Sequence, residues 1–163
     1  MGGETPFQTV GPYLHIGLRE GLAAMTRGDG GPPMTVAGRL VDGAGAGIPD
    51  GVLEFWAPGF RTIGRAFTSA DGSYTLETEA PGDASADPGG APHFAVRVLA
   101  RGILTQYMTR MYFDGHPAND ADPVLAALPA DRRTTLLARR HDAGRWTFDV
   151  VVQGRGETVF FDL

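Results

Sequence analysis

Short segments in which apolar and polar residues alternate dominate the chain. Met34, Val36 and Leu40 fall on one face of such a segment, and Thr35 and Arg39 fall on the other. This two-residue period is typical of a strand with one buried face. Similar β-rich segments cover 48–55, 74–78, 94–100, 106–113 and 146–153. The pattern therefore predicts about six or seven short strands.

Turn residues separate these segments. The glycine-rich run 42–47 ends the first strand, so 48–55 is expected to return beside it, and Asp71-Gly72 predicts a turn before 74–78. Two Gly/Pro-rich stretches, 19–33 and 79–91, are expected to be loops. A helical turn is predicted over 121–128, with Pro123 at its first position, and a second short helix over 132–137.

Many short strands punctuated by turns predict an all-β fold, a β-sandwich with short helical insertions. The chain has 163 residues, with 24 Gly, 12 Pro and no Cys. This length suits a single domain over 1–163 with its own core. The absence of Cys excludes disulfides and thiolate chemistry.

Charge excludes further classes of function. All 14 basic residues are Arg, so a Schiff-base lysine and a P-loop lysine are both absent. A net charge of −5 argues against nucleic-acid binding. No apolar run is long enough to span a membrane, and no secretory leader is visible. We therefore expect a cytoplasmic protein with neither a nucleic-acid nor a membrane partner.

The residues alone do not define a self-contained active site. The histidines at 15, 93, 116 and 141 lack the spacing of metal ligands, and no Gly-x-Ser-x-Gly motif is present. The run 43–48 joins two predicted strands and opens no helix, so it is interpreted as a turn and not as a dinucleotide site. On this evidence the chain is a β-sandwich without chemistry of its own.

The N-terminal segment is more specific. Residues 5–17, Thr-Pro-Phe-Gln-Thr-Val-Gly-Pro-Tyr-Leu-His-Ile-Gly, resemble the opening of the α subunits of protocatechuate 3,4-dioxygenases, which are intradiol dioxygenases. Further blocks of resemblance follow in the same order at 91–93, 100–103, 109–113, 148–150 and 154–163. The resemblance therefore extends from residue 5 to the end of the chain.

This resemblance implies an Ig-like mixed β-sandwich and a defined reaction. The family inserts both atoms of O2 into protocatechuate (3,4-dihydroxybenzoate) and opens the ring to 3-carboxy-cis,cis-muconate. Its ferric iron is held by two Tyr and two His of a homologous β subunit. The implied partner is therefore a β subunit carrying Fe(3+), within a higher-order α–β oligomer.

The family's ligand positions agree with an α chain. The segment 56–60, Trp-Ala-Pro-Gly-Phe, lacks the first Tyr, and Ala84 stands at the second. Of the His-x-His pair, His93 is kept and Ala95 replaces the other. The resemblance implies that this chain binds no iron itself, and His93 is expected to be a buried, hydrogen-bonded relic.

The resemblance also implies which residues of this chain reach the substrate of the β subunit. They are Thr9, Gly11, Pro12, Tyr13 and Arg101. Glycine permits close backbone approach to a planar ligand, proline stiffens the loop, and a guanidinium suits an aromatic carboxylate. The arm 1–33 would then contribute to the subunit interface and the pocket. The alternatives are an ordinary turn with Tyr13 packed at the interface, and an interface ion pair for Arg101.

Two other hypotheses stay open. The chain could be a non-catalytic β-sandwich module for ligand binding or assembly, or a single-chain dioxygenase with its own iron. The missing ligands argue against the second. The aromatic C-terminal segment 154–163 is expected to be docked onto the domain in each case.

Overall fold

The computed structural model describes residues 5–6, 8–11, 13–18, 32–82 and 88–162. The strands are β1 Pro33–Val41, β2 Val52–Trp56, β3 Gly64–Phe67, β4 Ser73–Glu79, β5 His93–Leu99, β6 Tyr107–Phe113, β7 Leu137–Asp142, β8 Arg145–Thr147 and β9 Val150–Val151. The short helices are α1 Leu14–Gly17, η2 Pro117–Asp120, α2 Pro123–Ala127, α3 Ala130–Arg133 and η3 Thr134–Leu136. The helical turn predicted over 121–128 is confirmed as α2.

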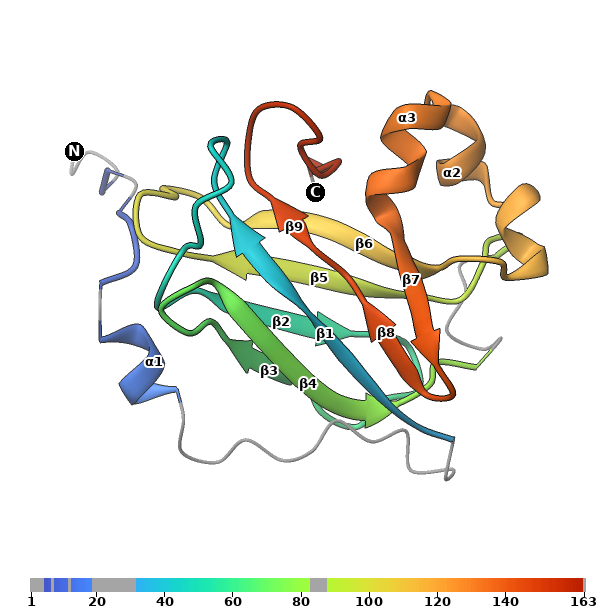
Figure 1. Cartoon of the computed structure of the whole chain (residues 1–163), viewed down its shortest axis with the longest axis horizontal. Coiled ribbons are helices and arrows are strands. Elements are labelled where there is room, and N and C mark those ends of the chain that lie inside the picture. Colours follow the sequence, from blue (N-terminus) through green and yellow to red (C-terminus); the bar gives the residue numbers. More distant parts are fainter. Residues whose placement is uncertain (1–4, 7, 12, 19–31, 83–87, 163) are drawn as a thin grey trace.

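The strands form two packed layers (Figure 1). Their order is β3-β2-β5-β6-β7-β8-β1-β4, and β9 pairs with β1. One layer contains β3, β2, β5 and β6, and the other contains β7, β8, β1 and β4. Pairs β6–β7, β1–β8 and β1–β9 are parallel, whereas the other pairs are antiparallel. The predicted mixed β-sandwich is therefore confirmed.

The core lies between the layers, where the alternating apolar residues meet. Met34, Val36 and Leu40 of β1 are all buried, as their spacing predicts. Phe55 of β2 and Phe94 of β5 pack edge to face with ring centroids 6.2 Å apart. A smaller apolar cluster lies beneath the short helices and contains Ala91, Tyr112, Leu125, Leu136 and Val159.

The segment 48–55 returns beside β1 only at its first residue, where the amide of Ile48 donates to the carbonyl of Leu40 at 2.9 Å; for the rest of the segment that prediction was wrong. β2 crosses to the opposite layer and pairs with β3 and β5. The redirection occurs in the connection, where Asp50 has a positive φ of 57°. Because β2 is a central strand, side chains on both of its faces are buried, including Glu54. Alternation within a single strand cannot show which partner the strand will take.

The last third of the chain departs from its predicted elements in two ways. The segment 146–153 is two strands, because side chains replace ladder partners between β8 and β9: the carbonyl of Phe148 accepts from the Tyr74 hydroxyl, and the amide of Arg39 donates to Asp149 Oδ1. The predicted helix 132–137 ends before Leu137, which begins β7. The short strand β3 was not predicted at all, since it has only 4 residues and contains a glycine.

The C-terminal segment is docked, as predicted. Phe161 forms an antiparallel bridge with Met108 of β6, and Thr109 donates a hydrogen bond to the carbonyl of Val159 at 2.7 Å. No helix in the described ranges is long and apolar enough to cross a membrane.

Candidate functional site

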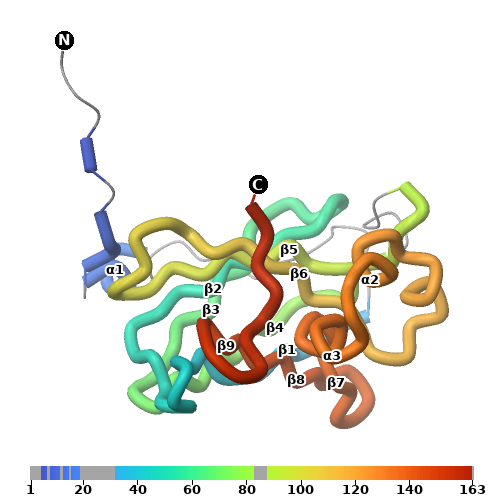
Figure 2. The backbone as a smooth tube through the Cα atoms, turned by 90° about the horizontal axis from the view of Figure 1, so that it is seen from above, coloured from blue at the N-terminus to red at the C-terminus, as the bar shows by residue number. Residues whose placement is uncertain are grey.

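The N-terminal arm is attached to the loop between β5 and β6. The amide of Gly102 donates a hydrogen bond to Thr9 Oγ1 at 2.8 Å. The same hydroxyl lies 3.4 Å from the carbonyl oxygen of Ala100 and donates to it. The segment that precedes α1 consequently runs beside the β5–β6 loop (Figure 2). Two predicted site segments, 91 residues apart in sequence, are thereby brought together.

Arg101 occupies the tip of a tight turn. The amide of Ile103 donates to the carbonyl of Ala100 at 3.2 Å, and Gly102 has a φ of +87°. A positive φ at the third position of a four-residue turn is readily adopted by glycine and strained for other residues. The turn therefore places Arg101 outside the sheet, where its side chain is 48% exposed.

Among the described residues, the guanidinium of Arg101 forms one ion pair. Its Nη2 lies 3.2 Å from Oδ2 of Asp50, whose side chain is 34% exposed. Asp50 precedes β2 and has a left-handed backbone, which aspartate tolerates better than most residues. An exposed pair of this kind contributes about 0–1 kcal/mol. The pair therefore orients the Arg101 side chain but is weak enough to be replaced by another partner.

Of the remaining predicted pocket residues, Gly11 and Tyr13 lie beside α1. Gly11 accepts a hydrogen bond from the amide of Leu14 at 3.2 Å, and the space around its α-carbon is open. Among the described residues, a larger side chain at position 11 would therefore meet no steric clash. Tyr13 precedes α1 and its side chain is 75% exposed. Pro12 lies outside the described residues.

His93, which corresponds to an iron ligand of the family, lies at the opposite end of β5 from the Arg101 turn, and its surroundings are buried. His93 is buried, with Nδ1 3.0 Å from the carbonyl oxygen of Ala91, so the expectation of a buried, hydrogen-bonded histidine is confirmed. Its ring packs 4.9 Å from the ring of Tyr112, measured between centroids. Phe60 is buried against the core ring of Phe94, and Ala84 lies outside the described residues.

These residues do not fit a tyrosinate–histidine iron site. The Tyr112 hydroxyl lies 3.4 Å from Oδ1 of Asp122 and 3.3 Å from Nη1 of Arg110. Burial raises the pKa of Tyr112 to about 12, although Arg110 opposes the shift. The phenol therefore keeps its proton near neutral pH. Within the described ranges, no group of three or more His, Cys, Asp or Glu is arranged to hold a metal ion.

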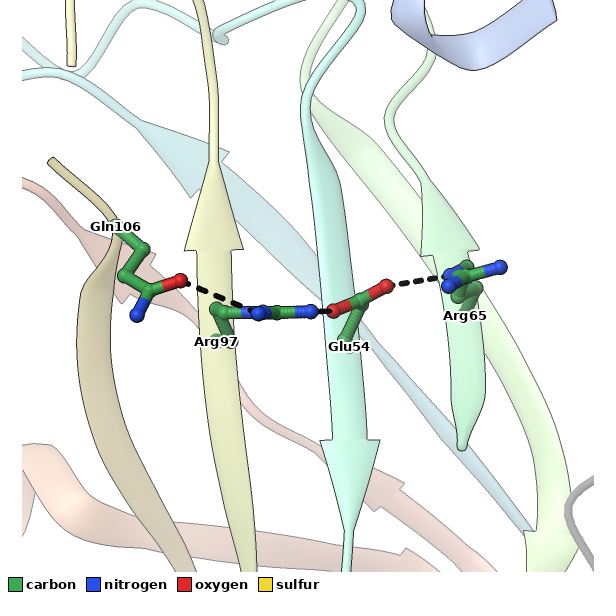
Figure 3. A network of polar contacts seen from close by, with 4 residues as sticks. All are labelled: Glu54, Arg65, Arg97 and Gln106. Carbon is green, nitrogen blue, oxygen red and sulfur yellow. Dashed lines mark hydrogen bonds and ion pairs between the residues drawn. The ribbon is translucent and has the colours of Figure 1, made fainter. Parts of the chain in front are cut away.

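A second polar feature, on the outer face of the β3-β2-β5-β6 layer, was not predicted. Arg65 Nε donates to Oε1 of Glu54 at 2.5 Å, and Arg97 Nε donates to Oε2 at 2.7 Å. Arg97 Nη1 also donates to Gln106 Oε1 at 3.2 Å. The four side chains lie in one row across neighbouring strands (Figure 3).

Burial raises the pKa of the Glu54 carboxyl, but hydrogen bonds and charges from the two arginines outweigh it and lower that pKa below its usual value. Glu54 is therefore ionised at neutral pH. Only the strand register, which pairs Glu54 with both Arg65 and Arg97, could have revealed this row.

The fold places the chain among dioxygenases. The dioxygenase domain of a dioxygenase carbohydrate-binding protein fusion from Streptomyces sp. SirexAA-E superposes with a TM-score of 0.64 and 30% identity. The match covers 93% of this chain and 99% of that domain.

Two relatives indicate which kind of dioxygenase chain this is. The protocatechuate 3,4-dioxygenase alpha chain of Burkholderia cepacia is 40% identical over 98% of both chains. The alpha chain from Pseudomonas putida is 37% identical over 98% of this chain and 96% of its own length. No family model matches the sequence. The chain belongs to the family of protocatechuate 3,4-dioxygenase alpha chains.

Proposed function

We propose that this chain works with an iron-bearing β subunit in the O2-dependent intradiol cleavage of protocatechuate to 3-carboxy-cis,cis-muconate. The proposal is supported by family membership and carried by one observation. Thr9 attaches the N-terminal arm to the Arg101 turn, so two segments predicted to face the substrate form one surface. This chain would shape the pocket and the α–β oligomer.

The ferric iron belongs to the partner in this proposal. The intradiol dioxygenase family implies a non-haem iron in the enzyme, which activates the bound catechol toward O2. His93 and Tyr112 of this chain are instead engaged with Ala91 and Asp122. Such committed, buried groups support a structural role at this end of β5.

Arg101 would bind the ring carboxylate of protocatechuate. Its guanidinium can donate paired hydrogen bonds to a carboxylate, and its exposed position leaves donors available. Gly11, Pro12 and Tyr13 would form the adjoining wall, where the open space around Gly11 allows a planar ring to approach the backbone. This surface would exclude water from one side of the substrate.

Replacing Arg101 tests this role in the complex with the β subunit. Arg101→Ala should lower kcat/KM for protocatechuate by about 30-fold, which corresponds to the loss of about 2 kcal/mol from a charged hydrogen bond. Catechol lacks the carboxylate, so its turnover should change less than about 3-fold. Arg101→Lys should fall between the wild type and Arg101→Ala, because one point charge replaces a planar fork.

The matched control is Arg139→Ala, which removes an exposed arginine paired with Asp149. It should leave both substrates unaffected. The visible tyrosinate-to-iron absorption band should be unchanged in each variant. Equal effects of Arg101→Ala on protocatechuate and catechol would contradict the carboxylate role. No effect on either would favour the alternative, a non-catalytic assembly module.

A further inference from the structure

Five Asp-Gly pairs occur in the sequence, and four of them lie in the described part of the chain. These four begin at Asp42, Asp50, Asp71 and Asp114, whereas the pair at Asp29 lies outside the described residues. In an Asp-Gly pair the backbone nitrogen of glycine can attack the aspartate carboxyl, because no side chain on glycine obstructs the approach. Whether the attack can occur then depends on how each pair is held in the fold.

The pair at Asp71 is held at both reacting groups. Asp71 Oδ1 accepts hydrogen bonds from Ser69 Oγ at 2.6 Å and from the amide of Ser73 at 3.0 Å. The amide of Gly72 donates to the carbonyl of Ser69 at 2.9 Å. The bonds from Ser69 and Ser73 hold the pKa of the Asp71 carboxyl well below its usual value. This disfavours the protonated carboxyl, which is the form that can lose water.

The pairs at Asp42 and Asp50 are each held at one reacting group. Asp42 Oδ1 accepts hydrogen bonds from two backbone amides, each at 2.9 Å. In the other pair, the nitrogen of Gly51 is buried and donates to Thr68 Oγ1 at 2.7 Å. Attack would require these bonds to break in both pairs.

The pair at Asp114 differs from the other three. Within the described ranges, no hydrogen bond or ion pair engages the Asp114 carboxylate or the Gly115 amide, and both residues are exposed. A β-carbon at Gly115 would meet no described atom within 4 Å, whereas one at Gly72 would lie 2.3 Å from the carbonyl oxygen of Leu40. Both reacting groups of this pair are therefore accessible and have room to move.

One weak bond closes the turn that contains this pair. The amide of His116 donates to the carbonyl of Phe113 at 3.2 Å, and Gly115 has a φ of +76°. The turn must open for the Gly115 nitrogen to reach the carboxyl carbon. The opposing hydrogen bond is longer than those that hold the other three pairs.

We propose that Asp114 is a site of spontaneous isomerisation to isoaspartate. The Gly115 nitrogen forms a bond to Cγ of the protonated Asp114 carboxyl, and the amide proton and the carboxyl hydroxyl leave as water, which gives a cyclic succinimide. Water then adds to the former main-chain carbonyl and breaks its bond to nitrogen. The main chain now runs through the side-chain carbonyl and leaves a free α-carboxylate. One water leaves and one returns, so the step needs no further reactant.

The modification falls where β6 joins the second layer. The amide of Asp114 donates to the carbonyl of Ala138 at 3.0 Å, next to the parallel pair of Phe113 and Ala138 that links β6 to β7. Isoaspartate adds one main-chain carbon at this point and lengthens the connection from β6 to the short helices. The site does not rest on the function proposed above.

Peptide mapping of the full chain after prolonged incubation at neutral pH in heavy-oxygen water tests the proposal. Every succinimide that opens takes up labelled oxygen, whether it yields aspartate or isoaspartate, and tandem mass spectrometry locates the label. In the folded chain Asp114 should take up label at least about 5-fold faster than Asp42, Asp50 or Asp71, because each additional hydrogen bond that must break slows ring closure by about 5-fold. In urea the four pairs should react within about 3-fold of one another, because the hydrogen bonds are lost and every pair has glycine second.

Two variants sharpen the test. Asp114→Glu keeps the charge but would have to close a larger ring, so label and isoaspartate should disappear at this position alone. Ser69→Ala removes one bond to Asp71 and should speed uptake there by about 5-fold. Far-UV circular dichroism verifies that each variant is folded.

Equal uptake at the four pairs of the folded chain, or no uptake at Asp114 in the folded chain, overturns the proposal. Isoaspartate-specific fragment ions at position 114, absent from Asp114→Glu, support it. The measurement involves neither substrate nor the β subunit. Failure of the Arg101 predictions therefore leaves this site intact, and the two proposals fail separately.

Discussion

The two ends of β5 carry the chain's two most informative side chains, and they differ in almost every physical respect. His93, at the start of the strand, is buried and packed on Tyr112. Arg101, just beyond the end, lies on a glycine-dependent turn and forms an exposed ion pair with Asp50. One end is committed to internal contacts, whereas the other keeps donors available to a ligand.

This difference separates a side chain committed to the core at the start of β5 from an exposed side chain just beyond its end. A buried polar group that loses its partner leaves another buried group unsatisfied, at a cost of about 1–3 kcal/mol for each. An exposed ion pair can exchange its partner for a ligand at little cost. Substitutions near His93 should therefore act mainly on stability, and those near Arg101 mainly on substrate binding.

The largest expected effect is at the buried end, on Asp122. Its carboxylate accepts hydrogen bonds from the amides of Ala91, Val124 and Leu125 at 2.8, 2.9 and 2.9 Å. Asp122→Ala removes the cap of α2 and leaves the buried amides of Ala91 and Leu125 unsatisfied, so the free energy of unfolding should fall by roughly 3–5 kcal/mol. Chemical denaturation of the full chain measures this loss.

Asp120→Ala is the control for that substitution. The Asp120 side chain is 93% exposed and pairs only weakly with Arg133 at 3.2 Å. Its loss should change the free energy of unfolding by less than about 0.5 kcal/mol. Similar effects of the two substitutions would show that the buried hydrogen bonds of Asp122 contribute no more to stability than an exposed ion pair.

The second prediction concerns alkaline pH. Burial raises the pKa of Tyr112 to about 12, above its value of 10.0 in the unfolded chain. Between pH 10 and 12 the unfolded phenol loses its proton while the folded one keeps it. Stability is therefore complete below pH 10 and falls as pH rises through this window, by about 2–3 kcal/mol.

Tyr112→Phe removes this contribution and should flatten the decline measured by denaturation at several pH values. Burial also raises the pKa of Tyr74 well above its usual value, so part of the decline should remain in the variant. An identical pH dependence in Tyr112→Phe and the wild type would show that Tyr112 is not protected from water.

The sequence predicted some elements of the fold well and others poorly. Period-two alternation was sufficient for β1, and Pro123 was sufficient for the start of α2, because both signals are local. The crossing of β2 and the Glu54 row depend on which strands become neighbours. That choice follows from packing over long sequence distances, which no local pattern contains.

In the candidate site too, contacts between residues far apart in the sequence could not be predicted. Motif resemblance singled out Thr9 and Arg101, but their connection through the amide of Gly102 needed the fold. Asp50 was not predicted as a partner of Arg101, because 51 residues separate the two in sequence. Its unusual backbone could not be inferred, since aspartate only occasionally adopts a positive φ.

The third prediction addresses the attachment of the arm at the exposed end. Thr9→Val keeps the side-chain shape but removes the hydroxyl that accepts from Gly102 and donates to Ala100. One such hydrogen bond contributes about 1 kcal/mol. Hydrogen exchange of the Gly102 amide should therefore become about 5-fold faster, as measured by NMR.

Thr9→Ser keeps the hydroxyl and should retain the protection of Gly102. In the complex with the β subunit, Thr9→Val should also lower kcat/KM for protocatechuate a few-fold. Unchanged exchange in Thr9→Val would mean that the arm is held to the β5–β6 loop by other contacts.

The smallest expected effect is at Asp50, where orientation and competition act on Arg101 in opposite directions. Asparagine adopts a positive φ as readily as aspartate, so Asp50→Asn isolates the charge from the backbone. Removing a carboxylate 3.2 Å from the guanidinium leaves Arg101 free to bind the substrate carboxylate. KM for protocatechuate should fall about 2-fold in the complex, consistent with the loss of about 0.5 kcal/mol from an exposed pair. A rise in KM would instead show that Asp50 holds Arg101 in its binding position, and the exposed end of β5 would then be more ordered than its single ion pair suggests.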